Sequence, residues 1–195
     1  MAVAGDGSKE GSLAGLFCWR IEVQSRHSNA MNRFEEIDWT TWIPQERATL
    51  LFVKRDGYVL LIRKKRGLGA GKINGPGGRI DGDETPLQAA IREVQEELLV
   101  TPIDVVARGE LAFQFADGYA LFVFVFSASD CIGEVQETDE AIPLWTPIDE
   151  LPFDQMWADD RLWLPHLLNE QPFRGNFLFD GDTMLGYEVV LKTPS

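Results

Sequence analysis

The sequence contains two cysteines, Cys18 and Cys131, which are too few for a disulfide framework. Such a chain is typical of a reducing compartment, and we expect it in the cytoplasm. No stretch reaches the roughly eighteen apolar residues of a membrane-spanning helix, so we expect no membrane partner. The apolar run at residues 13–19 follows acidic residues and lacks a small-residue cleavage pattern, so it does not predict a signal peptide.

Basic side chains are also scarce. The chain has 18 Lys and Arg residues against 31 Asp and Glu residues, for a formal net charge of -13. An acidic surface disfavours long-range attraction to nucleic acid polymers and to anionic membranes, so we expect neither as a partner. A small anionic substrate that is delivered with a metal ion remains compatible with this charge.

The length of 195 residues predicts one domain with an appendage. Residues 1–30 are rich in Gly, Ser and Ala, and three interpretations compete for them: a disordered tail, an extra strand near residues 16–23, or upstream codons wrongly included. We favour the tail, because disorder concentrates at chain ends. We therefore expect a partly disordered N-terminal extension at 1–44 and a folded domain at 45–195.

Alternating apolar residues and Asp-Gly turns predict several hairpins within that domain. The expected pairs are 48–53 with 58–62, 103–115 with 120–127, and 173–179 with 187–191. A short strand is expected at 142–145, a helical turn at 149–151, and a helix at 159–169 that Pro165 must interrupt unless it lies in the first turn. Strands with separated helices and hairpin links indicate an α+β class.

The rest of the chain is arranged around residues 75–100. Thr85, Pro86 and Gln88 form the pattern of an N-cap, a first-turn proline and a capping box. An apolar stripe follows at helical spacing, made of Leu87, Ala90, Ile91, Val94 and Leu98. The sequence therefore predicts a helix with one buried face.

Three acids on this helix, Glu93, Glu96 and Glu97, are spaced i, i+3 and i+4 and project from one side. Like charges placed in this way repel one another, so a bound cation is expected to offset the repulsion. Carboxylate oxygens are the ligands that Mg²⁺ and Mn²⁺ prefer. The alternative is a solvated acidic helix face.

Basic residues and glycines precede this helix at 63–66 and 67–71. Glycines let backbone N–H groups approach a phosphate closely, so the two runs together predict a phosphate-binding loop. Arg79 has the same potential to face phosphate. The alternative is a solvated strand end beside a flexible loop.

The spacing of Gly78, five residues, Glu84, seven residues and then Arg92-Glu93-Val94-Gln95-Glu96-Glu97 resembles the signature of the Nudix hydrolases. The resemblance implies cleavage of a nucleoside diphosphate linked to another group, with a divalent metal on this loop and helix. One position departs from the signature: Leu99 stands where a glycine usually ends the helix in the left-handed conformation.

A second candidate region, residues 151–165, places Trp157 beside Asp159 and Asp160. An aromatic ring can stack on a base, and adjacent carboxyls can read the edge of a purine. In a dry pocket two such carboxyls do not both ionise easily, so one becomes a donor. The alternative is that Asp159 or Asp160 caps the following helix. Phe113 or Phe115 can also form the floor of a base pocket.

Residues 64–78 and 151–165 together resemble the MutT-homologue class of the family, which hydrolyses oxidised purine nucleoside triphosphates such as 8-oxo-dGTP and 2-oxo-dATP. The resemblance implies a Nudix fold with a mixed β-sheet sandwiched between helices, a small nucleotide substrate, Mg²⁺ with Mn²⁺ possible, and a monomer. By position it implies base recognition by Asn74, Trp157, Asp159 and Asp160, a nucleotide site lined by Thr49 and Lys64, and metal ligands from the Gly77 carbonyl, Glu93, Glu96, Glu97 and Glu140. We also expect Pro76, Gly77, Gly78, Arg79 and Phe113 to contact the substrate. Leu68 and Pro76 stand where the animal enzymes have aromatic residues.

The expected reaction is metal-assisted hydrolysis to the nucleoside monophosphate and pyrophosphate. Glu93, Glu97 and Glu140 are the candidate general bases, and we expect Arg92 to pair with an acid of the signature. Alternatives are a Nudix hydrolase for methylated purine nucleotides, general dNTPs, sugar nucleotides or capped RNA, and a non-catalytic nucleotide-sensing module. The intact acids argue against the last of these.

Overall fold

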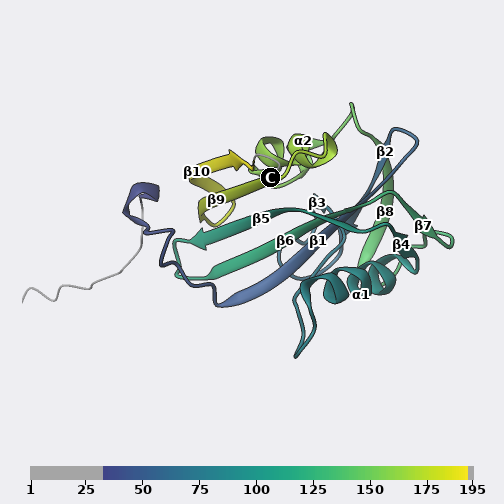
Figure 1. Ribbon diagram of the computed structural model, residues 1–195, viewed down its shortest axis with the longest axis horizontal. Helices are drawn as coiled ribbons and strands as arrows, with labels where there is room; N and C mark the ends of the chain where they lie inside the picture. The colour runs from purple at the N-terminus through teal and green to yellow at the C-terminus, as the bar shows by residue number, and fades with distance from the viewer. Residues whose placement is uncertain (1–32, 193–195) are drawn as a thin grey trace, which may run out of the picture.

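The computed structural model describes residues 33–192. Figure 1 shows a twisted sheet with α1 on one face and α2 on the other, which is the expected α+β arrangement. The elements are η1 (Phe34–Glu36), β1 (Glu46–Arg55), β2 (Tyr58–Lys64), β3 (Ile73–Asn74), α1 (Pro86–Leu98), β4 (Thr101–Ile103), β5 (Val106–Phe115), β6 (Ala120–Ala128), β7 (Asp130–Ile132), β8 (Ala141–Pro147), η2 (Phe153–Gln155), α2 (Asp160–Leu168), β9 (Phe173–Asp180) and β10 (Thr183–Leu191).

The strands of the main sheet run in the order β10-β9-β5-β6-β1-β2-β3, and β8 pairs with β2. The β1–β6 and β5–β9 pairs are parallel and the others are antiparallel, so the sheet is mixed as expected. The three predicted hairpins form, and Asp56 and Gly57 make the first turn with positive φ angles. The first strand of the second hairpin was expected to begin at Ile103, but it begins at Val106, and Ile103 instead ends β4 (Thr101–Ile103), which pairs with β7.

β1 and β2 separate soon after their turn, and this separation creates the site. Only the last two residues of β1 pair with β2: Lys54 lies opposite Val59, and Arg55 lies opposite Tyr58. Along the rest of that edge the loop at 76–80 takes the place of β2, because Leu51 N donates to Pro76 O at 2.9 Å and Thr49 N donates to Gly78 O at 2.8 Å. The loop at 76–80, which contains Gly77 and Gly78 and is called the glycine loop below, is therefore fixed against the central strand β1.

Helix α1 begins as its sequence predicts. Thr85 and Gln88 form a capping box, and Pro86 is the first helical residue. The buried face is made of Ala89, Ala90, Val94, Glu97 and Leu98. The predicted stripe is wrong at one end, because Leu87 is 42% exposed on the first turn while Ala89 is buried. Leu99 ends the helix in the left-handed conformation, with φ 60°.

Two other expectations need correction. The helical turn predicted at 149–151 lies later, as η2, because the chain first makes an ordinary turn after β8. Pro165 neither interrupts α2 nor lies in its first turn; it is inside the helix. A proline there lacks one N–H, so the helix loses a hydrogen bond without ending.

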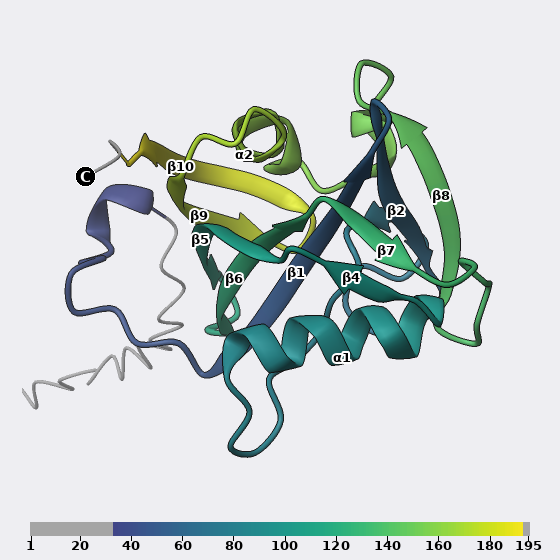
Figure 2. The same ribbon diagram turned by 45° about the vertical axis from the view of Figure 1, so that its right-hand side comes forward.

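Two apolar clusters sandwich the sheet. One lies under α2 and includes Phe52, Trp163, Phe173 and Phe177, and the other lies under α1. Figure 2 shows α1 running along the lower face of the sheet while α2 lies above β9. The segment before β1 packs at one end of the sheet, where Trp42 Nε1 donates to Gln114 Oε1 of β5 at 2.9 Å and η1 contacts β10.

The interpretations of residues 1–30 fall outside the described residues. In residues 33–192, no helix is both long and apolar enough to span a membrane.

Candidate active site

Glu97 is the most buried acid of the helix face, with a side chain that is 1% exposed. Its Oε2 accepts a hydrogen bond from Gly77 N at 2.8 Å, and its Oε1 lies 3.8 Å from Lys64 Nζ. Burial raises the pKa of Glu97 to about 7, although Lys64 and the Gly77 N–H both act in the opposite direction. The residue is therefore a buried acid with an incomplete set of positive partners.

The two glycines before Arg79 pack tightly between β1 and the acids of α1, and neither position has room for a side chain. A Cβ on Gly77, which has φ 153°, would lie 2.0 Å from Thr49 O, and a Cβ on Gly78 would lie 2.5 Å from the Glu93 carboxylate. Glu93 is mostly buried, and burial is the largest cause of its raised pKa. The loop and the helix are thus in direct contact.

Arg92 pairs with the acids of the signature, as predicted. It lies 2.8 Å from Glu84 through Nε, and its Nη1 lies 2.8 Å from Glu93 and 3.0 Å from Glu96. Nη2 also donates to Arg79 O at 3.0 Å. Hydrogen bonding to Glu84 is the largest cause of the raised pKa of Arg92. Arg92 therefore joins the glycine loop to α1.

The basic run at 63–66 is less open than the phosphate-loop interpretation requires. Arg66 forms an ion pair with Glu140, and Lys65 pairs with Glu137 at 2.6 Å. Arg63 donates to Gly71 O at 3.0 Å. Lys64 Nζ lies 3.3 Å from Gly77 O, next to Glu97. Lys64 is thus the member of the run that reaches the acidic face.

The carboxylates of Glu93, Glu96, Glu97 and Glu140 and the Gly77 carbonyl are all oxygen ligands of the kind that a divalent metal prefers, but their oxygens point to different partners in this structure. In the part of the chain that is described, no group of three His, Cys, Asp or Glu side chains is arranged closely enough to hold a metal ion. Arg92 engages oxygens of Glu93 and Glu96, and Arg66 engages Glu140. The charges of Glu93 and Glu140 both contribute to the raised pKa of the buried Glu97, and carboxylates gathered in this way are a suitable donor set for a hard cation.

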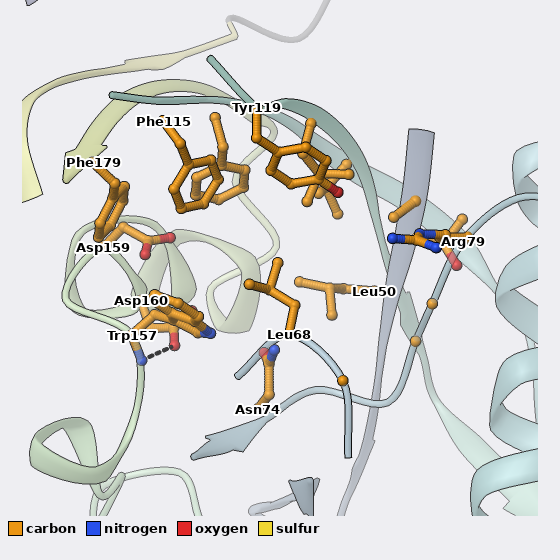
Figure 3. A pocket seen from close by; sticks show the side chains of 18 of the residues that line it. Leu50, Leu68, Asn74, Arg79, Phe115, Tyr119, Trp157, Asp159, Asp160 and Phe179 are labelled. Atoms are coloured by element: carbon orange, nitrogen blue, oxygen red, sulfur yellow. Dashed lines mark hydrogen bonds between the residues drawn. The ribbon is translucent and has the colours of Figure 1, made fainter. Parts of the chain in front are cut away.

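A cavity of about 310 Å³ opens beside this acidic face (Figure 3). Eleven residues that the sequence pointed to line it: Thr49, Gly67, Asn74, Gly77, Gly78, Arg79, Phe113, Phe115, Trp157, Asp159 and Asp160. Lys64 and Pro76 do not line it; the Pro76 carbonyl instead accepts from β1. Thr49 Oγ1 is buried without a hydrogen-bond partner in the described residues, so it is available to a ligand.

Asp159 and Asp160 lie together at one end of the cavity, each 2% exposed. Asp160 Oδ2 accepts from Trp157 N at 3.0 Å, and Asp159 Oδ2 accepts from Trp163 Nε1 at 2.8 Å. Asp159 occupies the N-cap position of α2 but makes no cap hydrogen bond, so the capping interpretation is wrong for it. Burial raises the pKa of Asp159 to about 6 and that of Asp160 well above its usual value, to which the charge of Asp159 also contributes.

Aromatic side chains surround this end of the cavity. Trp157 packs edge-on against Phe179 at 5.8 Å, and Lys72 Nζ lies 4.8 Å from the Trp157 ring centroid. Phe113 stacks on Phe177 at 5.3 Å, and Phe115 also lines the cavity. The arrangement offers apolar walls and a polar end, which suits a planar heteroaromatic group.

Several lining residues were not predicted. They are Ala48, Leu50, Tyr119, Leu121, Val123, Trp163 and Phe179. The alternation of β1 and β6 could have placed Ala48, Leu50, Leu121 and Val123 on one face. Tyr119 and Phe179 carry no such signal, because they meet the cavity through the turn after β5 and through the parallel pairing of β5 with β9.

The chain is similar to proteins of known activity. A family model described as NUDIX domain matches residues 22–167. The chain is 45% identical to the oxidized purine nucleoside triphosphate hydrolase of Danio rerio over 70% of its own length and 88% of that protein. It is 39% identical to the mouse protein of the same name, over 72% of the chain and 92% of the relative. Among solved structures, a MutT protein from Bacillus halodurans matches with a TM-score of 0.67 and 27% identity, over 74% of this chain and 97% of that one.

Proposed function

Because the chain belongs to the Nudix family of hydrolases, we propose that it hydrolyses oxidised or modified purine nucleoside triphosphates, such as 8-oxo-dGTP and 2-oxo-dATP, to the monophosphate and pyrophosphate. The names of the fish and mouse relatives support this substrate class. In a cell this reaction would remove damaged precursors from the nucleotide pool.

One observation carries the proposal: a single cavity joins the buried aspartates to the glycine loop. Asp159, Asp160 and Trp157 line one end, and Gly77 and Gly78, which contact the acids of α1, line the other. A nucleotide whose base lies at the first end therefore extends its phosphates toward the acidic helix face.

At the phosphate end, the Gly77 carbonyl and Glu93, Glu96, Glu97 and Glu140 are the residues that would hold the metal. When bound, the metal supplies neutralisation of phosphate charge and activation of water. Arg92 orients Glu93 and Glu96, while the Gly77 N–H fixes Glu97 Oε2. The general base that accepts the proton of water is one of Glu93, Glu97 and Glu140.

At the base end, Asp159 and Asp160 share a proton in the proposed working state. Two adjacent buried carboxyls do not readily ionise together, so one donates a hydrogen bond while the other accepts. Together with Asn74, this pair can recognise the exchanged donor and acceptor positions of an oxidised purine. Trp157 supplies the face on which the base stacks.

We further propose that Mg²⁺ is the working metal, with Mn²⁺ as a substitute, and that the protein acts as a cytoplasmic monomer. The all-oxygen donor set supports magnesium. The low cysteine content supports a reducing compartment.

The test is a panel of steady-state measurements of pyrophosphate release with Mg²⁺. The substrates are dGTP, 8-oxo-dGTP, dATP, 2-oxo-dATP, O6-methyl-dGTP and a sugar nucleotide, and the Glu97→Gln protein is the blank. The proposal predicts the largest kcat/KM for an oxidised or modified purine. Equal turnover of all the triphosphates would indicate a general pyrophosphohydrolase, and binding without turnover would indicate a sensing module.

A further inference from the structure

Arg79 is the one Lys or Arg side chain among the described residues that line the cavity. Figure 3 shows it at the end opposite Trp157, Asp159 and Asp160, on the side nearer α1. In a chain with a formal charge of -13, a cation at this position is well placed to meet a phosphate.

Two residues outside the signature contact or flank Arg79. Arg79 Nε lies 2.8 Å from Glu46 Oε2, and the Tyr119 hydroxyl donates to the same Glu46 oxygen. Glu46 therefore engages the Nε side of the guanidinium. The terminal N–H groups are the ones that best recognise phosphate in a bidentate way.

The backbone on both sides of this cluster is anchored. Arg79 forms a bridge with Ala48 of β1, and its carbonyl accepts from Arg92. The Tyr119 carbonyl accepts from Gln114 Nε2 at 3.1 Å. Gln45 Nε2 donates to Gly118 O at 2.8 Å, which links the start of β1 to the same turn. The cluster is thus positioned by hydrogen bonds independent of any ligand.

Tyr119 also lies between the two ends of the cavity. Its ring centroid is 5.5 Å from that of Phe115, which packs on Phe179 at 5.8 Å and so continues to the wall around Trp157. A nucleotide has its sugar between base and phosphate. If the base lay near Trp157, the sugar would lie at the level of Tyr119 and the first phosphate near Arg79.

We propose that Arg79 binds the phosphate next to the sugar, and that Glu46 and Tyr119 are positioning residues that hold its guanidinium toward that phosphate. The inference rests on the proposed nucleotide function, and it adds Glu46 and Tyr119 to the residues on which that function depends.

The test compares a ligand that has the phosphate with one that lacks it. Binding of 8-oxo-dGMP and of 8-oxo-deoxyguanosine is measured by calorimetry without metal, so that turnover plays no part. The variants are Arg79→Gln, Arg79→Lys, Glu46→Gln and Tyr119→Phe, each checked by thermal melting. Arg47→Gln is the matched control, because Arg47 lies over Phe124 and does not line the cavity.

We expect Arg79→Gln to weaken 8-oxo-dGMP binding about tenfold, and Glu46→Gln and Tyr119→Phe about threefold each, with the nucleoside unaffected. Arg79→Lys should recover part of the loss. Tyr119→Phe should add little to Arg79→Gln, because a positioning residue has no effect once the group it positions is gone.

Equal losses for the nucleoside and the monophosphate, or no loss for either, would overturn the inference. The proposed function has a separate readout in the same experiment. If wild-type protein binds dGMP as tightly as 8-oxo-dGMP, the base preference fails while the Arg79 comparison still stands. Failure of every ligand to bind would overturn both.

Discussion

The backbone N–H of Gly77 donates to Oε2 of Glu97 at 2.8 Å, across 20 residues of sequence. This contact joins the loop beside β1 to helix α1, and it fixes the acid that is most deeply buried. The same loop continues into the cavity wall through Gly78 and Arg79. The acidic helix face and the nucleotide cavity are consequently parts of one site.

Gly77→Ala is expected to disrupt this contact. An added Cβ would lie 2.0 Å from Thr49 O, and the φ of 153° is rarely adopted by residues with a side chain. We expect a loss of more than about 3 kcal/mol in the free energy of unfolding or, if the loop shifts, a loss of activity of about 100-fold. Urea unfolding and kcat measure the two outcomes.

Gly82→Ala is the matched control for that substitution. Gly82 also has positive φ, at 51°, but no heavy atom lies within 4 Å of its added Cβ. Its cost should be about 1 kcal/mol, with unchanged kcat. Similar behaviour of the two alanine variants would contradict the close packing of Gly77 on β1.

The acids of the signature should differ in their effect on catalysis. Glu97→Gln should lower kcat at least about 100-fold, because Glu97 is buried on the face that would hold the metal. Glu84→Gln should cost less, since Glu84 acts through Arg92 and lies at the edge of the loop. A larger loss of kcat for Glu84→Gln than for Glu97→Gln would refute this order.

Glu97 also predicts how stability of the metal-free protein depends on pH. Burial raises its pKa from an ordinary 4.5 to about 7, so the folded state binds its proton more tightly than the unfolded state does. Its favourable contribution is complete below about pH 4.5 and is lost as pH rises through about 7.

Glu97→Gln should therefore unfold at a higher temperature than wild type at pH 8 in the presence of a chelator. The increase in the free energy of unfolding over wild type should reach about 1–3 kcal/mol at pH 8 and should become smaller as the pH is lowered toward 4.5. Thermal melts of both proteins across this range measure the difference. A gain that does not change with pH would show that titration of Glu97 is not its source.

Leu99 tests whether its left-handed backbone conformation costs stability, because replacing it with glycine should then stabilise the protein. It ends α1 with φ 60° and is 54% exposed, so its side chain loses little surface on folding. Leu99→Gly should stabilise the protein by about 1 kcal/mol, because glycine adopts this conformation without strain. Thermal melting measures the change, and kcat should be unaffected.

Gln95→Gly is the control for the helix exit. Gln95 is exposed on the same helix but lies within it, so the same new residue should destabilise by about 1 kcal/mol. If both glycine variants lose stability, the strain assigned to Leu99 is absent.

Local patterns predicted much of this fold. The capping box at Thr85, the Asp-Gly turn after β1 and the alternating phenylalanines of β5 depend on neighbouring residues, so the sequence displays them directly. Pro165 was predicted to break the helix or to lie in its first turn, but the buried packing of Leu164 before it and Leu167 after it keeps α2 continuous.

The sequence predicted site residues that belong to a local motif. It did not predict residues that reach the site only through the pairing of distant strands. Glu97 and Asp160 belong to motifs of fixed spacing. Tyr119 and Glu46 meet Arg79 only because β1 pairs in parallel with β6, which no local pattern specifies. Pro76 was expected at the cavity, but its carbonyl pairs with Leu51, since β2 leaves that edge of β1 free.

The most direct test of the central claim is a competition between 8-oxo-dGTP and dGTP in one reaction with Mg²⁺. Chromatography follows the loss of each triphosphate and the appearance of each monophosphate. If Asp159, Asp160 and Trp157 select an oxidised base, 8-oxo-dGTP is consumed first, and the preference falls in the Trp157→Ala protein. Consumption of both triphosphates at equal rates by the wild-type protein would contradict the claim.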